Sequence, residues 1–300
     1  MERVSDRKRR GPLNLGLSPD TDAALVVPDD GRYTPTIKPH SLDKIRAHNR
    51  FARMFATSMR KKWAQLAYIG LYAGAGHARI DDSDKIVQTS SLAVLRQPDP
   101  FTHYVYVDND PRCVEALAQR TSALSPFANV TIIGKDVNAC IPAVRAALPS
   151  FSPRYGLLSF CFVDPFDTKL RFDTIKALAD LRIDFLILLM LGNDARRNLW
   201  NYFHDPDCTR IAEFVDRSDW RNEYKNDGKI VRCVLRLFDE AMQRVGYPSS
   251  KDTILPIYAH GTKVLQYVLA FYSKSPFGVQ LWQENVKSLT RLHPQTQLEL

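Results

Sequence analysis

Five short apolar runs between residues 64 and 191 leave few folds open to this chain. They cover residues 64–72, 102–108, 129–134, 156–164 and 183–191, and stretches of helical pattern lie between several of them. Runs of this length, bounded by Gly, Pro and Asp, are typical of buried strands. Strands that alternate with helices form parallel sheets through crossover connections. The sequence therefore predicts an α/β fold.

Two helices have clear signatures. In residues 110–124, Asp110 is the expected N-cap, Pro111 takes the first helical position, and an apolar stripe follows. An amphipathic helix of about 20 residues is expected to begin with Ser41 as its N-cap. Its basic face is suited to contact with nucleic acid or simply with water.

Two further apolar runs, residues 253–260 and 262–272, lie late in the chain and are separated by a Gly-Thr link. Their spacing predicts an antiparallel hairpin. A parallel sheet that ends in such a hairpin is the layout of the Rossmann-like class I methyltransferases, which use S-adenosylmethionine (SAM). This is the fold that we expect.

Composition divides the chain further. Residues 1–40 are rich in Pro, Gly, Asp and Arg, and their apolar residues follow neither a helical nor a strand period. This composition indicates a disordered or draped segment, followed by a methyltransferase-like domain over residues 41–300. Residues 192–250 are charged and helical in pattern, so we expect a helical insertion or lid there.

No run approaches the ~18 apolar residues of a membrane span, and no secretory signal is evident. A cytoplasmic protein without membrane contact is expected.

Residues suited to a nucleotide-type ligand follow the first four predicted strands. In an open parallel sheet, ligands bind outside the carboxyl ends of the strands. Glycines allow a tight turn and close approach of a cofactor, a carboxylate can hold ribose hydroxyls, and a polar residue beside an apolar one suits an adenine ring. In chain order these residues are Gly74 and Gly76, then Asp108, then Asp136 and Val137, then Asp164, Pro165 and Phe166.

Several nucleotide cofactors can be compared with this pattern. Arg79 stands where a dinucleotide fingerprint has its third glycine, and Asp108 comes 32 positions after Gly76 instead of the ~20 typical of NAD sites. A P-loop motif is absent from the sequence. SAM requires only a Gly turn, a ribose carboxylate and an adenine pocket, so it fits best. Each residue also has a purely structural reading, as a bend or a helix cap.

Five segments resemble the three-Cys-motif partner proteins (TcmP), a bacterial family with a methyltransferase-like Rossmann core. The segments are "LAYIGLYAGAGHAR", "YVYVDNDPRCVEAL", "VTIIGKDVN", "FCFVDPFDTKLRFDTIKAL" and "SPFGVQLW". The resemblance covers about residues 40 to 290. It implies a SAM-type pocket and a partner, a three-Cys-motif protein that is similar to radical-SAM enzymes.

This chain departs from the family pattern at three positions. Gly70 replaces an Asp that would contact the methionine ammonium of SAM, and Tyr72 stands where Phe is usual. Asp167 replaces the Gly that usually follows the Asp-Pro-Phe element. Tyr72 is counted with Gly74, Gly76, Asp108, Asp136 and Val137 among the expected cofactor-binding residues.

The Asp-Pro-Phe element is suited to methylation of a base amino group. Asp164 and the carbonyl of Pro165 would accept hydrogen bonds from the exocyclic amine, while Phe166 would stack on the base. The match to the D/N-P-P-aromatic loop of adenine methyltransferases is partial. Asp164 is equally suited to capping the helix that follows.

The sequence thus predicts a SAM-dependent methyltransferase, with nucleic acid as the favoured substrate. The net charge of +8 suits a polyanion, although a basic solvated surface has the same composition. Two alternatives stay open: a catalytically inactive scaffold that binds a partner, and a nuclease that holds a metal on Asp164 and Asp167. The spacing of His and Cys residues predicts no metal site.

Overall fold

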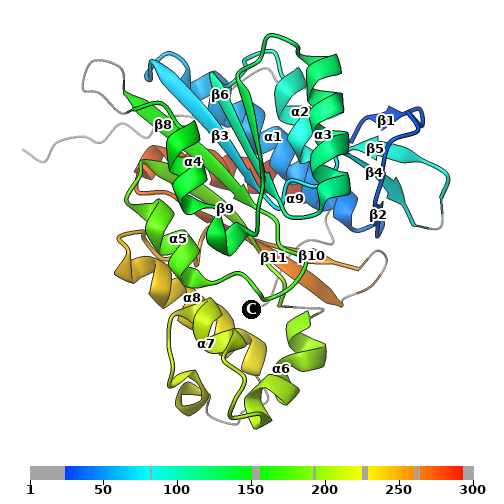
Figure 1. Cartoon of the computed structure of the whole chain (residues 1–300). Coiled ribbons are helices and arrows are strands. Elements are labelled where there is room, and N and C mark those ends of the chain that lie inside the picture. Colours follow the sequence, from blue (N-terminus) through cyan, green and yellow to red (C-terminus); the bar gives the residue numbers. More distant parts are fainter. Residues whose placement is uncertain are drawn as a thin grey trace, which may run out of the picture.

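The computed structural model describes residues 24–81, 83–150, 156–191, 194–224, 229–259, 262 and 264–292. A seven-stranded sheet forms its centre, in the order β10-β11-β9-β8-β3-β6-β7 (Figure 1). Five of these strands run parallel, and their bounds confirm the predicted apolar runs: β3 (Gln65–Leu71), β6 (His103–Asp108), β7 (Val130–Gly134), β8 (Leu157–Val163) and β9 (Ile183–Leu189).

The predicted hairpin completes this sheet at one edge. Strands β10 (Ile254–Tyr258) and β11 (Leu265–Tyr272) pair antiparallel to each other, and β11 pairs antiparallel to β9. The chain starts the sheet at β3, adds β6 and β7 on one side, and then crosses to β8 on the other side. This order, with β11 as the one reversed strand, is that of the Rossmann-like class I methyltransferase fold, and it places the switch point at β3.

Alternating strand residues build a separate core on each face of the sheet. One face packs against α1 (Ser41–Met59), α2 (Ser90–Arg96) and α9 (Pro276–Leu292), with Tyr68 and Phe160 facing this layer. The other face packs against α5 (Phe172–Ala179), α7 (Arg210–Val215) and α8 (Ile230–Arg244), with Ile69 and Val163 facing that layer. Helices α3 (Pro111–Leu124) and α4 (Ile141–Ala147) complete the two layers.

The helix starts test the capping predictions. The Asp110 side chain accepts a hydrogen bond from Arg112 N and Pro111 opens α3, as predicted. For α1 the predicted cap is wrong. Ser41 is the first helical residue, and His40 holds the cap position without a side-chain hydrogen bond.

A second, four-stranded sheet was not predicted. Its order is β1 (Val26–Val27), β5 (Ile86–Gln88), β4 (His77–Ile80) and β2 (Thr36–Ile37), and it lies beside α3 in Figure 1. Residues 24–40, assigned above to a disordered or draped segment, therefore contribute two strands. Residues 1–23 lie outside the described part of the chain.

The predicted helical insertion between β9 and β10 is helical where the structure describes it. It comprises α6 (Asp194–His204), α7, the 3-10 turn Trp220–Glu223, and α8. These helices gather below the sheet in the view of Figure 1, and Trp220 is fully buried among them. Among the described residues, no helix is long and apolar enough to span a membrane.

Candidate functional site

A pocket lies at the carboxyl end of β3, where the strand order reverses. Its walls come from the turn after β3, the first turns of α1, the start of α2, strand β4 and the segment after β8. Of the predicted site residues, Tyr72, Gly74, Asp164 and Phe166 line this pocket. Gly76 and Pro165 are close to these residues in the chain, whereas Asp108, Asp136 and Val137 lie at the ends of β6 and β7.

The two turn glycines have different surroundings. Both have left-handed backbones, with φ of 66° at Gly74 and 84° at Gly76. A Cβ atom on Gly74 would meet nothing within 4 Å, whereas one on Gly76 would lie 2.8 Å from the Leu92 side chain. Gly74 therefore opens the backbone toward the pocket, and Gly76 allows close packing against α2.

The side chain of Asp108, at the end of β6, is hydrogen-bonded to the turn that follows β3. Its Oδ2 accepts a hydrogen bond from Gly74 N at 2.8 Å, and its Oδ1 accepts one from Asp110 N at 3.0 Å. The residue is 6% exposed. Each carboxylate oxygen keeps a second lone pair, so the group can fix the turn and still accept from a ligand hydroxyl.

Asp136 and Val137 follow β7, the third predicted strand. The exposed Asp136 accepts a hydrogen bond from Asn138 N and opens the 3-10 turn Val137–Ala139. Val137 is 3% exposed and packs into the core that includes Val163. The structure thus gives both residues a structural role, and neither lines the pocket beside β3.

Tyr72 links these neighbouring strand ends. Its φ of 62° is in the left-handed region, which is unusual for an aromatic residue and costs about 1–3 kcal/mol. Burial, followed by the charges of Asp136 and Asp167, raises the pKa of its hydroxyl above the ordinary value. Tyr72 is therefore a neutral hydrogen-bond donor at physiological pH.

Asp164 is paired with a lysine that the sequence analysis did not identify. Lys44 Nζ donates to Asp164 Oδ1 at 2.8 Å and to Oδ2 at 2.7 Å. The side chains are 13% and 19% exposed. Lys44 lies one turn before the buried His48 on the inward face of α1, and this helical spacing is the one sequence signal that could have revealed it.

The other two residues of the Asp-Pro-Phe element differ in their exposure to solvent. Pro165 is buried, and Phe166 is 72% exposed at the pocket mouth. Asp167, the second carboxylate of the metal-dependent alternative, lies 3.3 Å from Lys169 Nζ. Among the described residues, no group of three His, Cys, Asp or Glu side chains could hold a metal ion.

The structure gives a steric reason for glycine at position 70. Gly70 lies between Tyr106 on β6 and Phe162 on β8. A Cβ atom there would come within 3.1 Å of the Tyr106 ring and 3.3 Å of the Tyr68 ring. Tyrosine rings thus fill the space that an acidic side chain at position 70 would need.

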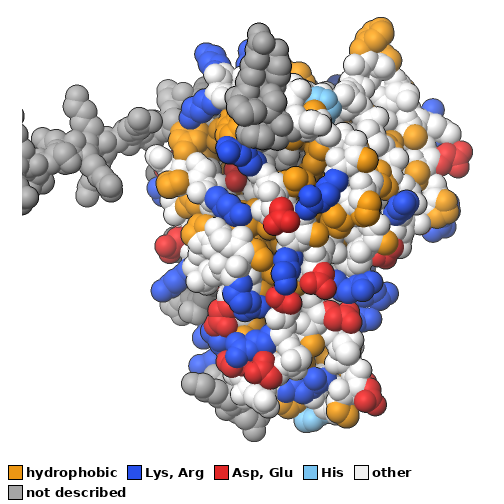
Figure 2. Space-filling view, turned by 60° about the vertical axis from the view of Figure 1, so that its left-hand side comes forward, with side chains coloured by type: hydrophobic (Ala, Val, Ile, Leu, Met, Phe, Trp, Pro, Cys, Tyr) orange, Lys and Arg blue, Asp and Glu red, His pale blue; other side chains and the backbone are white. Residues whose placement is uncertain are grey.

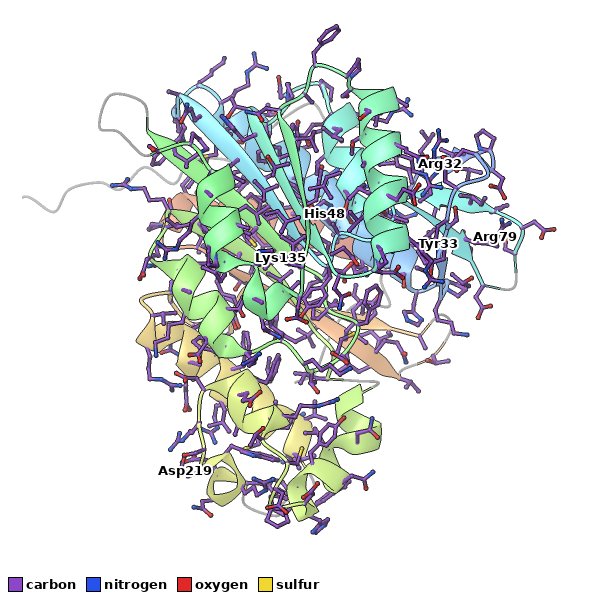
Figure 3. All side chains as sticks on the ribbon, viewed as in Figure 1. Arg32, Tyr33, His48, Arg79, Lys135 and Asp219 are labelled. Atoms are coloured by element: carbon purple, nitrogen blue, oxygen red, sulfur yellow. The ribbon has the colours of Figure 1, made fainter. Side chains whose placement is uncertain are left out.

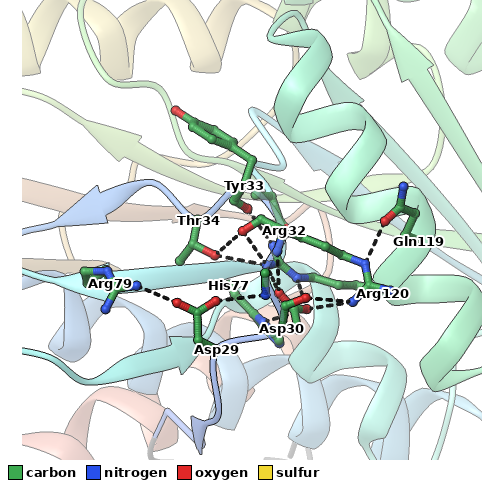
Figure 4. A network of polar contacts seen from close by, with 11 residues as sticks. Asp29, Asp30, Arg32, Tyr33, Thr34, His77, Arg79, Gln119 and Arg120 are labelled. Carbon is green, nitrogen blue, oxygen red and sulfur yellow. Dashed lines mark hydrogen bonds and ion pairs between the residues drawn. The ribbon is translucent and has the colours of Figure 1, made fainter.

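A buried polar network supports the far side of the turn (Figure 4). Arg120 donates to both carboxylate oxygens of Asp30, at 2.8 and 2.6 Å, and to the carbonyl oxygen of Ala75 at 2.8 Å. The guanidinium holds the pKa of Asp30 well below its usual range. Figure 3 places the neighbouring Arg32 and Tyr33 beside the small sheet. The network therefore joins the small sheet, α3 and the Gly turn.

Two buried polar atoms beside the pocket have no hydrogen-bond partner within the described residues. They are Thr89 Oγ1, just before α2, and His77 Nδ1, which lies 3.6 Å from Asp30 Oδ2. Both residues line the pocket. Buried polar atoms without partners are unfavourable unless a ligand or water satisfies them. The pocket therefore fits a ligand that bears polar groups.

No protein-family model matches this chain, and no curated protein matches its sequence. Similar solved structures include magnesium protoporphyrin IX methyltransferase (ChlM) from Synechocystis PCC 6803, at 12% identity and a TM-score of 0.40, with 78% of this chain and 86% of that chain covered. TYW2 from P. horikoshii, in complex with MeSAdo, is 10% identical with a TM-score of 0.41 over 85% and 73% of the two chains. Protein LPL1258 from Legionella pneumophila is 13% identical with a TM-score of 0.49 over 83% and 91%.

Proposed function

We propose that this chain is a SAM-dependent methyltransferase. The observation that carries the proposal is the turn at Gly74, which opens toward the pocket while the Asp108 carboxylate holds its backbone N–H. An open glycine turn tied to an acid on the adjacent strand, at the switch point, is suited to a nucleoside cofactor. SAM, when bound, supplies an electrophilic methyl group.

Each residue around the turn would contact a different part of the cofactor. The free lone pairs of Asp108 would accept from ribose hydroxyls, and the exposed Asp136 would accept from the adenine amine. Val137 would pack beneath the adenine from the core. Tyr72 would close the turn from the β7 side. Asp164, which follows β8, would then lie on the side of the turn opposite to Asp108 and Asp136.

The favoured substrate is the amino group of a nucleic-acid base. Asp164 would accept a hydrogen bond from the amine, and the exposed Phe166 would stack on the base at the pocket mouth. The Asp164 carboxylate would accept the proton that the amine loses when it is methylated. In Figure 2, Lys and Arg side chains alternate with Asp and Glu over the helical insertion, so the basic charge forms no continuous stripe on that face.

A three-Cys-motif protein is the proposed partner.

Transfer of a labelled methyl group tests the proposal. Purified chain, with and without the partner, would be incubated with methyl-labelled SAM and DNA, RNA or the partner. We expect label on nucleic acid and a loss of at least tenfold in rate for Asp164→Ala. Asp167→Ala is the matched control, because this acid lies three residues later in the same segment, does not line the pocket and pairs with Lys169. Equal rates in both variants would contradict the role of Asp164.

A second function, a scaffold without catalysis, is favoured by one observation. Both oxygens of Asp164 already accept hydrogen bonds from Lys44, so fewer acceptor sites are left for a substrate amine. Cofactor binding and a stable complex with the partner, in the absence of label transfer to any acceptor, would support the scaffold over the enzyme.

A further inference from the structure

An ion pair in the pocket wall has unused hydrogen-bonding capacity. Lys44 extends from the first turns of α1 and Asp164 follows β8, and both side chains are largely buried. Removing two charges from water is costly, and the cost is recovered only if the remaining donors and acceptors also find partners. The groups that complete this pair are therefore informative.

The count of donors and acceptors defines what is missing. An ammonium has three N–H donors, and within the described residues Lys44 Nζ donates to the two oxygens of Asp164. One donor is left on Lys44. The carboxylate offers about four lone-pair sites, so about two are left on Asp164. A ligand that carries a carboxylate beside an ammonium would satisfy both residues.

Among its described residues, the pocket has one titratable imidazole besides the ion pair, His77, and burial lowers the pKa of that group. Lys44 is the only Lys or Arg that lines it, and Asp164 is the only Asp or Glu. Position 70, where an acid could otherwise meet an ammonium, is closed by the rings of Tyr106 and Tyr68. An amino-acid group in this pocket therefore has one place where both of its charges are matched.

The sheet order gives the direction in which a long ligand would lie. The ends of β8, β3, β6 and β7 follow one another in space, in steps of about 4.8 Å. Asp108 and Asp136, the residues proposed for the nucleoside, lie at the β6 and β7 ends. The hydrogen bond from Asp164 N to Leu71 O keeps the β8 end against β3, at 3.2 Å. The opposite end of the ligand would thus lie beside Lys44.

We propose that Lys44 and Asp164 form the subsite for the amino-acid end of the cofactor. The third N–H of Lys44 donates to the α-carboxylate, and Asp164 accepts from the α-ammonium. One acceptor site on Asp164 is left for a substrate amine. This inference rests on the proposed function, because it requires an adenosyl amino acid as the ligand.

Two probes that differ only at this end test the subsite by calorimetry. S-adenosylhomocysteine carries the amino-acid group, and 5′-methylthioadenosine lacks it. For Lys44→Met we expect the affinity for S-adenosylhomocysteine to fall at least tenfold, while the affinity for methylthioadenosine changes less than twofold. Lys44→Arg should restore part of the loss. Lys61→Met, which removes an exposed charge just after α1, is the matched control and should change neither affinity.

The possible outcomes separate the subsite from the proposed function. If both probes bind the unmodified chain equally, or if Lys44→Met weakens both to the same degree, the subsite is wrong and the nucleoside site stands. If neither probe binds, the proposed function fails and the subsite with it. Thermal unfolding checks each variant. Should Lys44→Met fail to fold, Asp164→Asn keeps the shape, and the same selective loss of S-adenosylhomocysteine is expected.

Discussion

Gly74 and Gly76 share a left-handed backbone but have different surroundings. Substitution of Gly76 should therefore mainly lower the stability of the fold, and substitution of Gly74 should mainly lower the affinity for the ligand. Replacement of either by Ala costs about 1–2 kcal/mol in backbone strain. Gly76→Ala also forces a methyl group against Leu92, which adds about 1–3 kcal/mol. Gly74→Ala meets no protein atom but projects into the pocket. We expect Gly76→Ala to be the less stable variant in urea unfolding, and Gly74→Ala to bind S-adenosylhomocysteine at least tenfold more weakly than the unmodified chain.

Gly134→Ala serves as the control for both measurements. Its Cβ would make only ordinary contacts, at 3.8 Å from Val114. Unchanged affinity in Gly74→Ala, measured on folded protein, would show that the open side of the turn does not face the ligand.

At the scale of elements, a buried histidine joins α1 to the sheet. His48 Nε2 lies 2.9 Å from the Tyr68 hydroxyl on β3, and its ring lies in the interior (Figure 3). Burial lowers the pKa of His48 to about 4. Because this is below the value of about 6.5 in the unfolded chain, the stabilisation is complete above pH 6.5 and is lost as the pH falls toward 4.

The expected size of this pH effect follows from the shift. Between about pH 7.5 and pH 5, His48 should remove about 2 kcal/mol from the free energy of unfolding. In His48→Gln this component is absent, so its stability should fall less over the same range, as measured by urea unfolding. Parallel curves for the two proteins would show that His48 is not held neutral by the fold.

At the scale of the whole molecule, Arg120 joins the small sheet to the turn at Gly74–Gly76. Its side chain is 3% exposed and bonds Asp30, Tyr33 O and Ala75 O. Arg120→Met would remove the charge-assisted hydrogen bonds to the half-buried Asp30, which keeps Arg32 as a second partner, a loss of about 1.5–3 kcal/mol. We expect that loss in urea unfolding, with faster amide hydrogen exchange in residues 24–37. Arg112→Met, which breaks an exposed pair with Asp110, should cost less than about 1 kcal/mol. Similar losses in both variants would contradict this role.

Local patterns explain which parts of this molecule could be predicted. The strands of the large sheet were evident because each is a continuous apolar run, and the turn at Gly74 follows directly from one of them. The small sheet was missed because strands of two to four residues, such as Val26–Val27, carry no measurable period. The position of Val137 in the core was also hidden, because its side chain direction depends on the 3-10 turn that Asp136 opens.

The candidate site shows the same division between local and distant information. Asp108 and Gly74 are separate signals in the sequence, but the fold joins them by a hydrogen bond across neighbouring strands. Lys44 and Asp164 lie 120 positions apart, so no pattern of spacing connects them. Only the packing of α1 against the end of β8 brings the two charges together.

Calorimetric titration of the purified chain with S-adenosylhomocysteine, paired with Asp108→Asn, is the most direct measurement of whether this turn binds a cofactor. The one amide oxygen of Asn can still accept from Gly74 N but the acceptor for Asp110 N is lost, so thermal unfolding checks that the variant keeps the fold. We expect one molecule bound per chain, and an affinity at least tenfold lower in the variant, about 1.4 kcal/mol. Absence of binding to the unmodified chain, or equal affinity in the two proteins, would contradict the proposed cofactor site.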